Sequence, residues 1–237
     1  LGYDTAPING SVPTANISNV TFLDVRNKNI SDLTGIEGFN TLTTLYCFGN
    51  QLTSLDVSNN TALTDLRCFG NQLTSLDVSG ANALEILGCS SNQLTSLDVS
   101  NNNALTILGC GNNQLTSLGV SNNTALTSLS CDDNQLTSLD LSGATALNIL
   151  FCENSQLTSL DVRNGNNEAF FKFFAGENPN LTCIFVDDTD YSNANWTNID
   201  PASTFVENEA ECALSVEDNA LELDVFIYPN PTDNYLF

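Results

Sequence analysis

Apolar residues recur through the middle of the chain with a period of 21 residues. One unit reads Leu63-Thr-Asp-Leu66-Arg-Cys68-Phe-Gly-Asn71-Gln-Leu73. Cysteines mark the same place in six successive units, at Cys47, Cys68, Cys89, Cys110, Cys131 and Cys152. Apolar and polar residues alternate around each cysteine, which predicts a short strand with its Leu and Cys side chains inside. The fixed period predicts stacked coils that cannot fold singly.

The second half of each unit repeats this apolar spacing, as in Leu73-Thr-Ser-Leu76-Asp-Val78. Each coil should therefore carry two short parallel strand-like segments and little helix. Val20 and Leu42 take equivalent places, so a first coil of 22 residues begins at Val20. We expect about seven coils over residues 20–165, preceded by an N-terminal lead or cap over residues 1–19.

The spacing of Leu63, Leu66, Cys68, Asn71 and Leu73 matches the pattern LxxLxLxxNxL, with Cys in the place of one inward leucine. The chain therefore resembles the leucine-rich repeat proteins, in particular the nested 21-residue, cysteine-containing class secreted by Bacteroidetes. The resemblance implies a leucine-rich repeat solenoid closed by a C-terminal cap.

Stacking at about 4.8 Å per coil turns each sequence position into a column. The Asn column should pair backbone groups at the turns. The Cys column should behave as small buried hydrophobes, because parallel side chains on neighbouring strands are poorly placed for disulfides. The chain has no His to complete a zinc site in this column.

The positions on either side of each cysteine point outward and vary from coil to coil. Variable outward positions of a solenoid are where ligands are usually contacted, and exposed aromatic clusters are typical of interaction sites. The candidate ligand-binding residues are Tyr46, Phe48, Arg67 and Phe69 toward the N-terminus, and Asp132, Phe151 and Glu153 toward the C-terminus. Alternatively, an N-terminal segment containing Tyr3, Pro7 and Val12 covers the aromatic residues.

A second outward column is almost entirely aspartate: Asp56, Asp77, Asp98, Asp140 and Asp161, with Gly119 interrupting it. Stacked carboxylates repel each other by about 1 kcal/mol per pair in water. They need a counter-ion or hydrogen-bond donors. Calcium is one hypothesis, but it requires six to eight oxygen ligands, and backbone-bonded, solvated carboxylates are the alternative.

Residues 166–212 are expected to form the C-terminal cap. The Phe-rich run at 168–174 should plug the end of the core, and the two cysteines outside the ladder, Cys183 and Cys212, should form a disulfide. This segment is similar to the cap of the same bacterial repeat proteins. Asp187, Asp188 and Asp190 are a candidate calcium site in it, with a charged turn as the alternative.

Residues 213–225 are acidic and without pattern, as expected of a linker. The sequence that follows, Phe226-Ile-Tyr228-Pro-Asn230-Pro, resembles the opening of the type IX secretion sorting domain of Bacteroidetes. Residues 226–237 would be a truncated start of that domain. The resemblance implies a secreted or outer-surface protein.

The chain has 28 acidic and 5 basic residues and a net charge of -23, which disfavours nucleic acid and anionic membranes as partners. No apolar run is long enough to insert into a membrane. The absence of His excludes the usual Ser-His and Cys-His nucleophiles. We therefore expect a monomeric, non-enzymatic binding or adhesion module for a protein or glycan, without a cofactor. The alternative is a structural or calcium-stabilised surface spacer.

Overall fold

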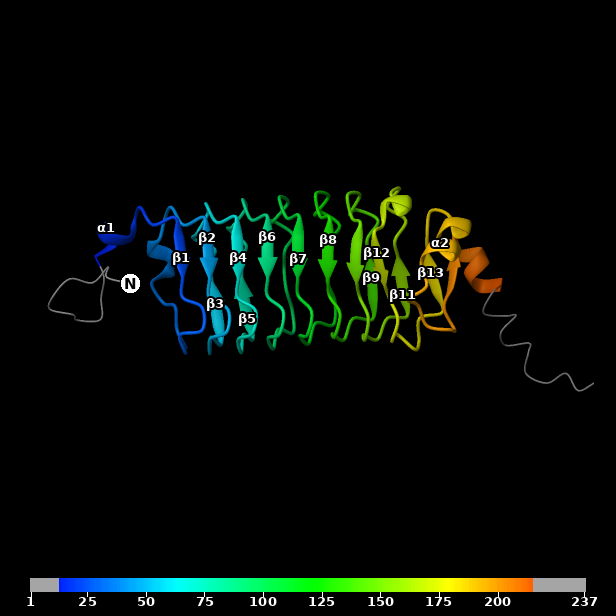
Figure 1. The fold of residues 1–237 in the computed structure, drawn as a ribbon, viewed down its shortest axis with the longest axis horizontal. Helices are drawn as coiled ribbons and strands as arrows, with labels where there is room; N and C mark the ends of the chain where they lie inside the picture. The colour runs from blue at the N-terminus through cyan, green and yellow to red at the C-terminus, as the bar shows by residue number, and fades with distance from the viewer. Residues whose placement is uncertain (1–12, 215–237) are drawn as a thin grey trace, which may run out of the picture.

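The computed structural model describes residues 13–214, which wind into an elongated solenoid (Figure 1). The first and last described segments lie at opposite ends of its long axis. Helix is scarce, as the sequence predicts. Within residues 13–214 it is confined to α1 (Thr14–Ile17), α2 (Thr189–Asn195), a helical turn at residues 209–214, and two 3-10 turns, η1 (Ile36–Gly38) and η2 (Asn167–Ala169).

The main sheet consists of eight parallel three-residue strands, one from each successive coil (Figure 1). Its strands, in spatial order, are β1 (Phe22–Asp24), β2 (Thr44–Tyr46), β4 (Asp65–Arg67), β6 (Ile86–Gly88), β7 (Ile107–Gly109), β8 (Ser128–Ser130), β10 (Ile149–Phe151) and β12 (Lys172–Phe174). The central residue of each strand is buried. Neighbouring strands pair without slippage, so each sequence position forms a straight column, as expected.

The second segments of the coils form two smaller parallel sheets. One contains β3 (Ser54–Asp56) and β5 (Ser75–Asp77), and the other contains β9 (Ser138–Asp140), β11 (Ser159–Asp161), β13 (Cys183–Phe185) and β14 (Thr204–Val206). The expected strand is missing from the two coils between them, at residues 96–98 and 117–119. Leu97 and Leu118 still point inside there. Gly119 lies in this gap, and glycine weakens a strand.

The core is a continuous stack of Leu, Val and Cys side chains. All six cysteines of the ladder are free and fully buried, which confirms that they are packing residues and not bridges. Burial raises the pKa of the Cys47 and Cys89 thiols to about 12, because the thiolate would lose its hydration. The ladder therefore stays uncharged at neutral pH.

The Asn column pairs the turn backbone, as predicted. The Nδ2 of Asn113 donates to the carbonyl of Cys110 in its own coil at 2.9 Å and to that of Cys89 in the preceding coil at 3.2 Å. Its Oδ1 accepts from the backbone N of Leu94 at 3.0 Å. Each such side chain therefore satisfies buried backbone groups of two coils at once.

The stacking continues past residue 165, the expected end of the repeats. β12 pairs with β10 in register, and Ala175 is buried in the place of the ladder cysteine. Asn178 takes up the Asn column again, donating to the carbonyl of Cys152 and accepting from the N of Leu157. The segment expected to be a cap thus forms coils of its own, ending at β14.

An aromatic cluster fills the C-terminal end of the core. Phe170 and Phe173 are buried as predicted, Trp196 stacks on Phe173 at 4.1 Å between ring centroids, and Phe205 lies against both Phe173 and Trp196. Phe171, from the same run, is instead 75% exposed. The predicted disulfide between Cys183 and Cys212 joins β13 to the last helical turn, with the Cα atoms 5.8 Å apart.

Three expectations lie outside the described residues. Tyr3, Pro7 and Val12, which could cover the aromatic residues, belong to residues 1–12. Nearly all of the expected linker and the whole of the expected sorting segment belong to residues 215–237.

Candidate ligand-binding face

Three columns of side chains make up the outward face of the main sheet. Two are the outer residues of each strand, and the third is the residue that follows each ladder cysteine. In chain order the first column is Phe22, Thr44, Asp65, Ile86, Ile107, Ser128, Ile149 and Lys172. The second is Asp24, Tyr46, Arg67, Gly88, Gly109, Ser130, Phe151 and Phe174, and the third is Arg26, Phe48, Phe69, Ser90, Gly111, Asp132, Glu153 and Gly176.

The four N-terminal candidates lie together. The Arg67 guanidinium forms two hydrogen bonds with Asp65, at 3.0 and 3.1 Å, and lies 5.0 Å from the centre of the Tyr46 ring. The Tyr46 hydroxyl donates to the same carboxylate at 3.1 Å. Phe48 and Phe69 stack with ring centroids 4.3 Å apart and an interplanar angle of 12°. These contacts hold the aromatic rings in fixed orientations at the surface.

Within the part of the chain that the structure describes, this aromatic cluster is partly open to solvent, with Tyr46 and Phe48 half-buried. Phe69 is 38% exposed, and Phe22, at the edge strand, is 52% exposed. Phe22 packs edge-on against Tyr46 at 5.5 Å and extends the cluster by one strand.

The C-terminal candidates form a second group on and after β8 and β10, which lie three and four strand-to-strand steps from β4. Phe151 stacks on Phe174 with ring centroids 5.0 Å apart, and the Nζ of Lys172 lies 5.7 Å from the Phe151 ring centre. Asp132 and Glu153 occupy neighbouring places in the third column. The two groups of candidates are therefore opposite ends of one face, not one cluster.

Carboxylates crowd this second end. Burial raises the pKa of Glu153, and the negative charges of Asp132, Glu177 and Asp133 raise it further. Every ion pair within residues 13–214 uses Arg26, Arg67 or Arg163, and none of these involves the four crowded carboxylates. Their negative charge is therefore not compensated by a described Lys or Arg at ion-pair distance.

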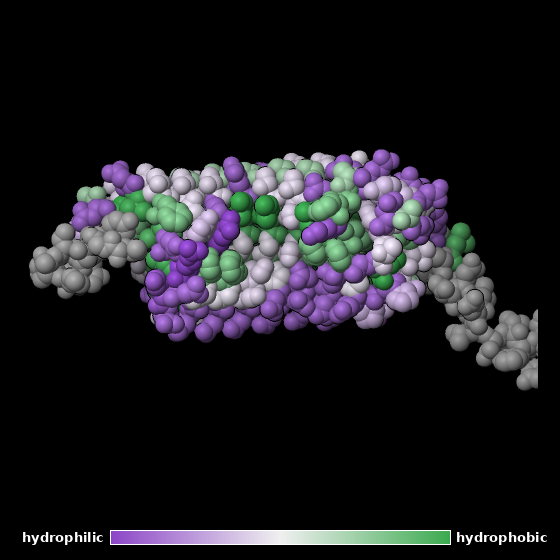
Figure 2. All heavy atoms as spheres, viewed as in Figure 1, coloured by the Kyte–Doolittle hydropathy of each residue, from purple (hydrophilic) through white to green (hydrophobic). Residues whose placement is uncertain are grey.

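Sequence reasoning missed the first column of the outward face. Ile107 is 42% exposed, and Ile86 beside it is partly exposed. In Figure 2 hydrophobic side chains gather over the middle strands of the main sheet, with further hydrophobic groups toward either end. The signal was available in the sequence. The residue two places after each Leu63-type leucine and the residue two places further on belong to the same strand, so both must face outward.

The aspartate column of the opposite side is bound to its own backbone. The Oδ1 atoms of Asp56, Asp77 and Asp98 accept from the backbone N two residues later at 2.8–2.9 Å. Hydrogen bonds from the side chains of Ser79 and Ser100, and then those from their backbone N, lower the pKa of Asp77 and Asp98. Two shallow recesses, of about 400 and 450 Å³, lie along this column. Hydrogen bonds from the backbone therefore account for the aspartate column without a bound metal ion.

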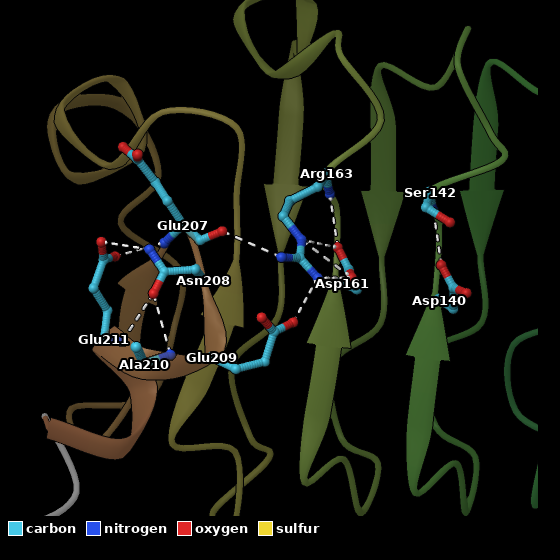
Figure 3. A network of polar contacts seen from close by, with 9 residues as sticks. All are labelled: Asp140, Ser142, Asp161, Arg163, Glu207, Asn208, Glu209, Ala210 and Glu211. Carbon is cyan, nitrogen blue, oxygen red and sulfur yellow. Dashed lines mark hydrogen bonds and ion pairs between the residues drawn. The ribbon is translucent and has the colours of Figure 1, made fainter.

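Asp161 ends this column and joins a polar network (Figure 3). Arg163 pairs with Asp161 at 2.6 Å and with Glu209 at 3.2 Å, and donates to the carbonyl of Glu207. The ion pairs fasten the last helical turn to β11. Arg163 also lies 4.8 Å from the Phe185 ring centre, so the network is structural.

Two of the three candidate calcium ligands have structural partners. The Asp188 side chain caps the N-terminus of α2 by accepting from the N of Tyr191 at 2.9 Å, and Asp187 accepts from the N of Gly165. Asp190 lies in the first turn of α2. Among residues 13–214 no three His, Cys, Asp or Glu side chains are grouped so that they could hold a metal ion. The calcium site stays a prediction.

The described helices are all too short and polar to cross a bilayer. No protein-family model and no curated protein sequence matches the chain.

Solved leucine-rich repeat structures do match it. The functional domain of InlJ from Listeria monocytogenes, which includes a cysteine ladder, is 34% identical over 74% of this chain and 46% of its own, with a TM-score of 0.55. The internalin inlF from the same organism is 24% identical over 79% of this chain and 62% of its own (TM-score 0.62). The plant peptide hormone receptor RGFR1, in complex with RGF2, is 18% identical over 82% of this chain and 38% of its own (TM-score 0.63).

These matches establish the fold as a leucine-rich repeat solenoid. The chain spans between 38% and 62% of the length of the three proteins.

Proposed function

We propose that the chain is a non-enzymatic binding or adhesion module that holds a protein ligand on the outward face of its main sheet. The observation that carries this proposal is the partly exposed cluster of Tyr46, Phe48 and Phe69 beside Arg67, in which Phe48 and Phe69 stack. Aromatic and Arg side chains are enriched at binding hot spots, because they bury a large area and lose little conformational entropy.

Two further features support the proposal. InlJ shares the cysteine ladder and the repeat. A solenoid of the same fold, the plant peptide hormone receptor RGFR1, is solved in complex with RGF2. The Cys183–Cys212 disulfide is in keeping with an oxidising compartment, and it supports the proposal that the protein acts outside the cell or on its outer surface.

The test is binding of the purified chain to protein and glycan arrays, followed by measurement of affinity for each hit. The variant Tyr46→Ser/Phe48→Ser/Phe69→Ser should lose at least tenfold in affinity. Leu214→Ser is the matched control, since Leu214 is also an exposed apolar side chain, 63% accessible, but lies outside the main sheet. Equal affinity of the triple variant and the parent would refute the assignment of the face. Hits confined to glycans would reject a protein ligand.

A further inference from the structure

Two glycines lie in the middle of the outward face without a structural reason for being glycine. Gly88 and Gly109 are paired residues of adjacent strands, and neither has a positive φ. A Cβ added to Gly88 would meet a Phe69 ring carbon at 3.7 Å, and one added to Gly109 would meet the Ser90 hydroxyl at 3.4 Å, both ordinary contacts. A Cβ would therefore fit at both positions.

Other glycines of the solenoid are required by crowding. A Cβ at Gly80 would lie 1.8 Å from the carbonyl oxygen of Ser58, and one at Gly143 would lie 2.2 Å from that of Ser121. Glycine weakens a strand, and it often marks a place where a ligand or another backbone approaches closely. That explanation fits Gly88 and Gly109, where crowding does not apply.

The surroundings of the two glycines are apolar and bounded. Ile86 and Ile107 lie beside them in the first column, and Ile107 is 42% exposed. The rings of Phe69 and Phe151 stand on either side along the solenoid axis. The strand that precedes Phe69 and the strand that contains Phe151 are four steps apart, or about 19 Å. An extended peptide of about six residues has this length.

The negative charge at one end of the outward face indicates which kind of ligand it binds. The uncompensated carboxylates of Asp132, Glu153, Asp133 and Glu177 lie at the C-terminal end of this stretch. The net charge of -23 opposes a second copy of the chain on the same surface. A partner that brings its own cation is complementary to this end of the face.

We propose that the outward face binds an extended polypeptide segment whose backbone passes over Gly88 and Gly109, with a Lys or Arg directed to Asp132 and Glu153. Aliphatic side chains of the segment contact Ile86 and Ile107. This inference rests on the proposed function of the same face and specifies its ligand.

The first test fills the space above the glycines. Gly88→Val/Gly109→Val should fold with an unchanged or higher melting temperature, because Val favours strands. It should weaken ligand binding at least tenfold. The matched control is Gly119→Val, which makes the same change on the other side of the solenoid, where nothing lies within 4 Å of the added Cβ. Full binding by the double variant would overturn the proposal.

The second test identifies the ligand chemistry with a displayed library of random linear dodecapeptides as the probe. Peptides enriched on the parent chain should contain a Lys or Arg together with aliphatic residues. Their affinity should fall at least fivefold on Asp132→Asn/Glu153→Gln and also at high salt. No enrichment, or enriched peptides without a basic preference, would overturn the proposal.

The experiments can refute the peptide path over the glycines without refuting the proposed binding face. If array ligands bind and the Tyr46/Phe48/Phe69 variant loses them while the Gly→Val variant keeps them, the binding face stands and the peptide path over the glycines is wrong. If the aromatic variant keeps all ligands, the proposed function itself is wrong.

Discussion

The side-chain amide of Asn71 donates to the carbonyl of Cys47 in the preceding coil, at 3.1 Å. The same nitrogen donates to Cys68 in its own coil, and the oxygen accepts from the N of Leu52. One side chain thus fixes the turn of its own coil and the distance to the coil before it.

Removing such an amide should destabilise the solenoid strongly. Asn113 is 8% exposed, and Asn113→Ala would leave the N of Leu94 and the carbonyls of Cys89 and Cys110 without these partners. We expect a loss of about 3 kcal/mol, since each unsatisfied buried group costs about 1–3 kcal/mol. Urea unfolding measures this loss. Gln114→Ala, at the exposed neighbour, should change stability by less than about 0.5 kcal/mol. Equal midpoints for the two variants would contradict the role of the column.

The buried thiols should make the fold sensitive to alkali. The folded-state pKa of Cys89 is raised to about 12 from an ordinary value of 9.0, so between these values the unfolded chain releases a proton that the folded chain retains. Stability from this source is complete below pH 9 and falls as the pH rises toward 12. The slope of stability against pH should be smaller in Cys89→Ala/Cys110→Ala, whatever its stability at pH 7. An unchanged slope would show that the thiols titrate alike in the folded and unfolded states, so that burial does not raise their pKa.

Reduction of the disulfide should loosen the C-terminal end first. Cys183 and Cys212 are 29 residues apart, and the chain-entropy model gives about 3–4 kcal/mol for closing a loop of that length. Hydrogen exchange in Cys183→Ser/Cys212→Ser should rise around β13 and β14, with little change near β2 and β4. Uniformly faster exchange along the whole solenoid would indicate that the disulfide stabilises more than its own end.

Calcium should have no effect on melting. The carboxylates of the aspartate column already accept backbone hydrogen bonds, as Asp98 does from the N of Ser100 at 2.9 Å. Thermal unfolding in EDTA and in millimolar calcium should therefore coincide. A higher melting temperature with calcium would favour the alternative of a calcium-stabilised spacer.

The repeat frame was predictable because packing enforces it. An inward Leu, a buried Cys and a bonded Asn must recur at one spacing wherever coils stack, so Leu66, Cys68 and Asn71 identify the fold by themselves. The continuation of the repeats through Asn178 could not be predicted from the 21-residue period. Phe151 and its strand partner Phe174 are 23 residues apart, and Ala175 replaces the cysteine. A two-residue insertion breaks the period in sequence while the strands still pair in space.

The candidate face was predictable only in part. Tyr46, Phe48, Arg67 and Phe69 were found because they flank the cysteines. The role proposed for Gly88 and Gly109 depends on knowing that no neighbour crowds them, which the sequence cannot reveal. The uncompensated charge of Glu153 likewise depends on which cations lie near it in space.

The in-register stacking of Gly88 on Gly109 has an evolutionary consequence. Duplication of one 21-residue unit at this point would lengthen the stretch between the two aromatic groups by one strand spacing, about 4.8 Å, and leave both groups intact. The length of ligand that related chains accept would then be inherited as a repeat number, in whole steps, without a single new contact residue having to arise.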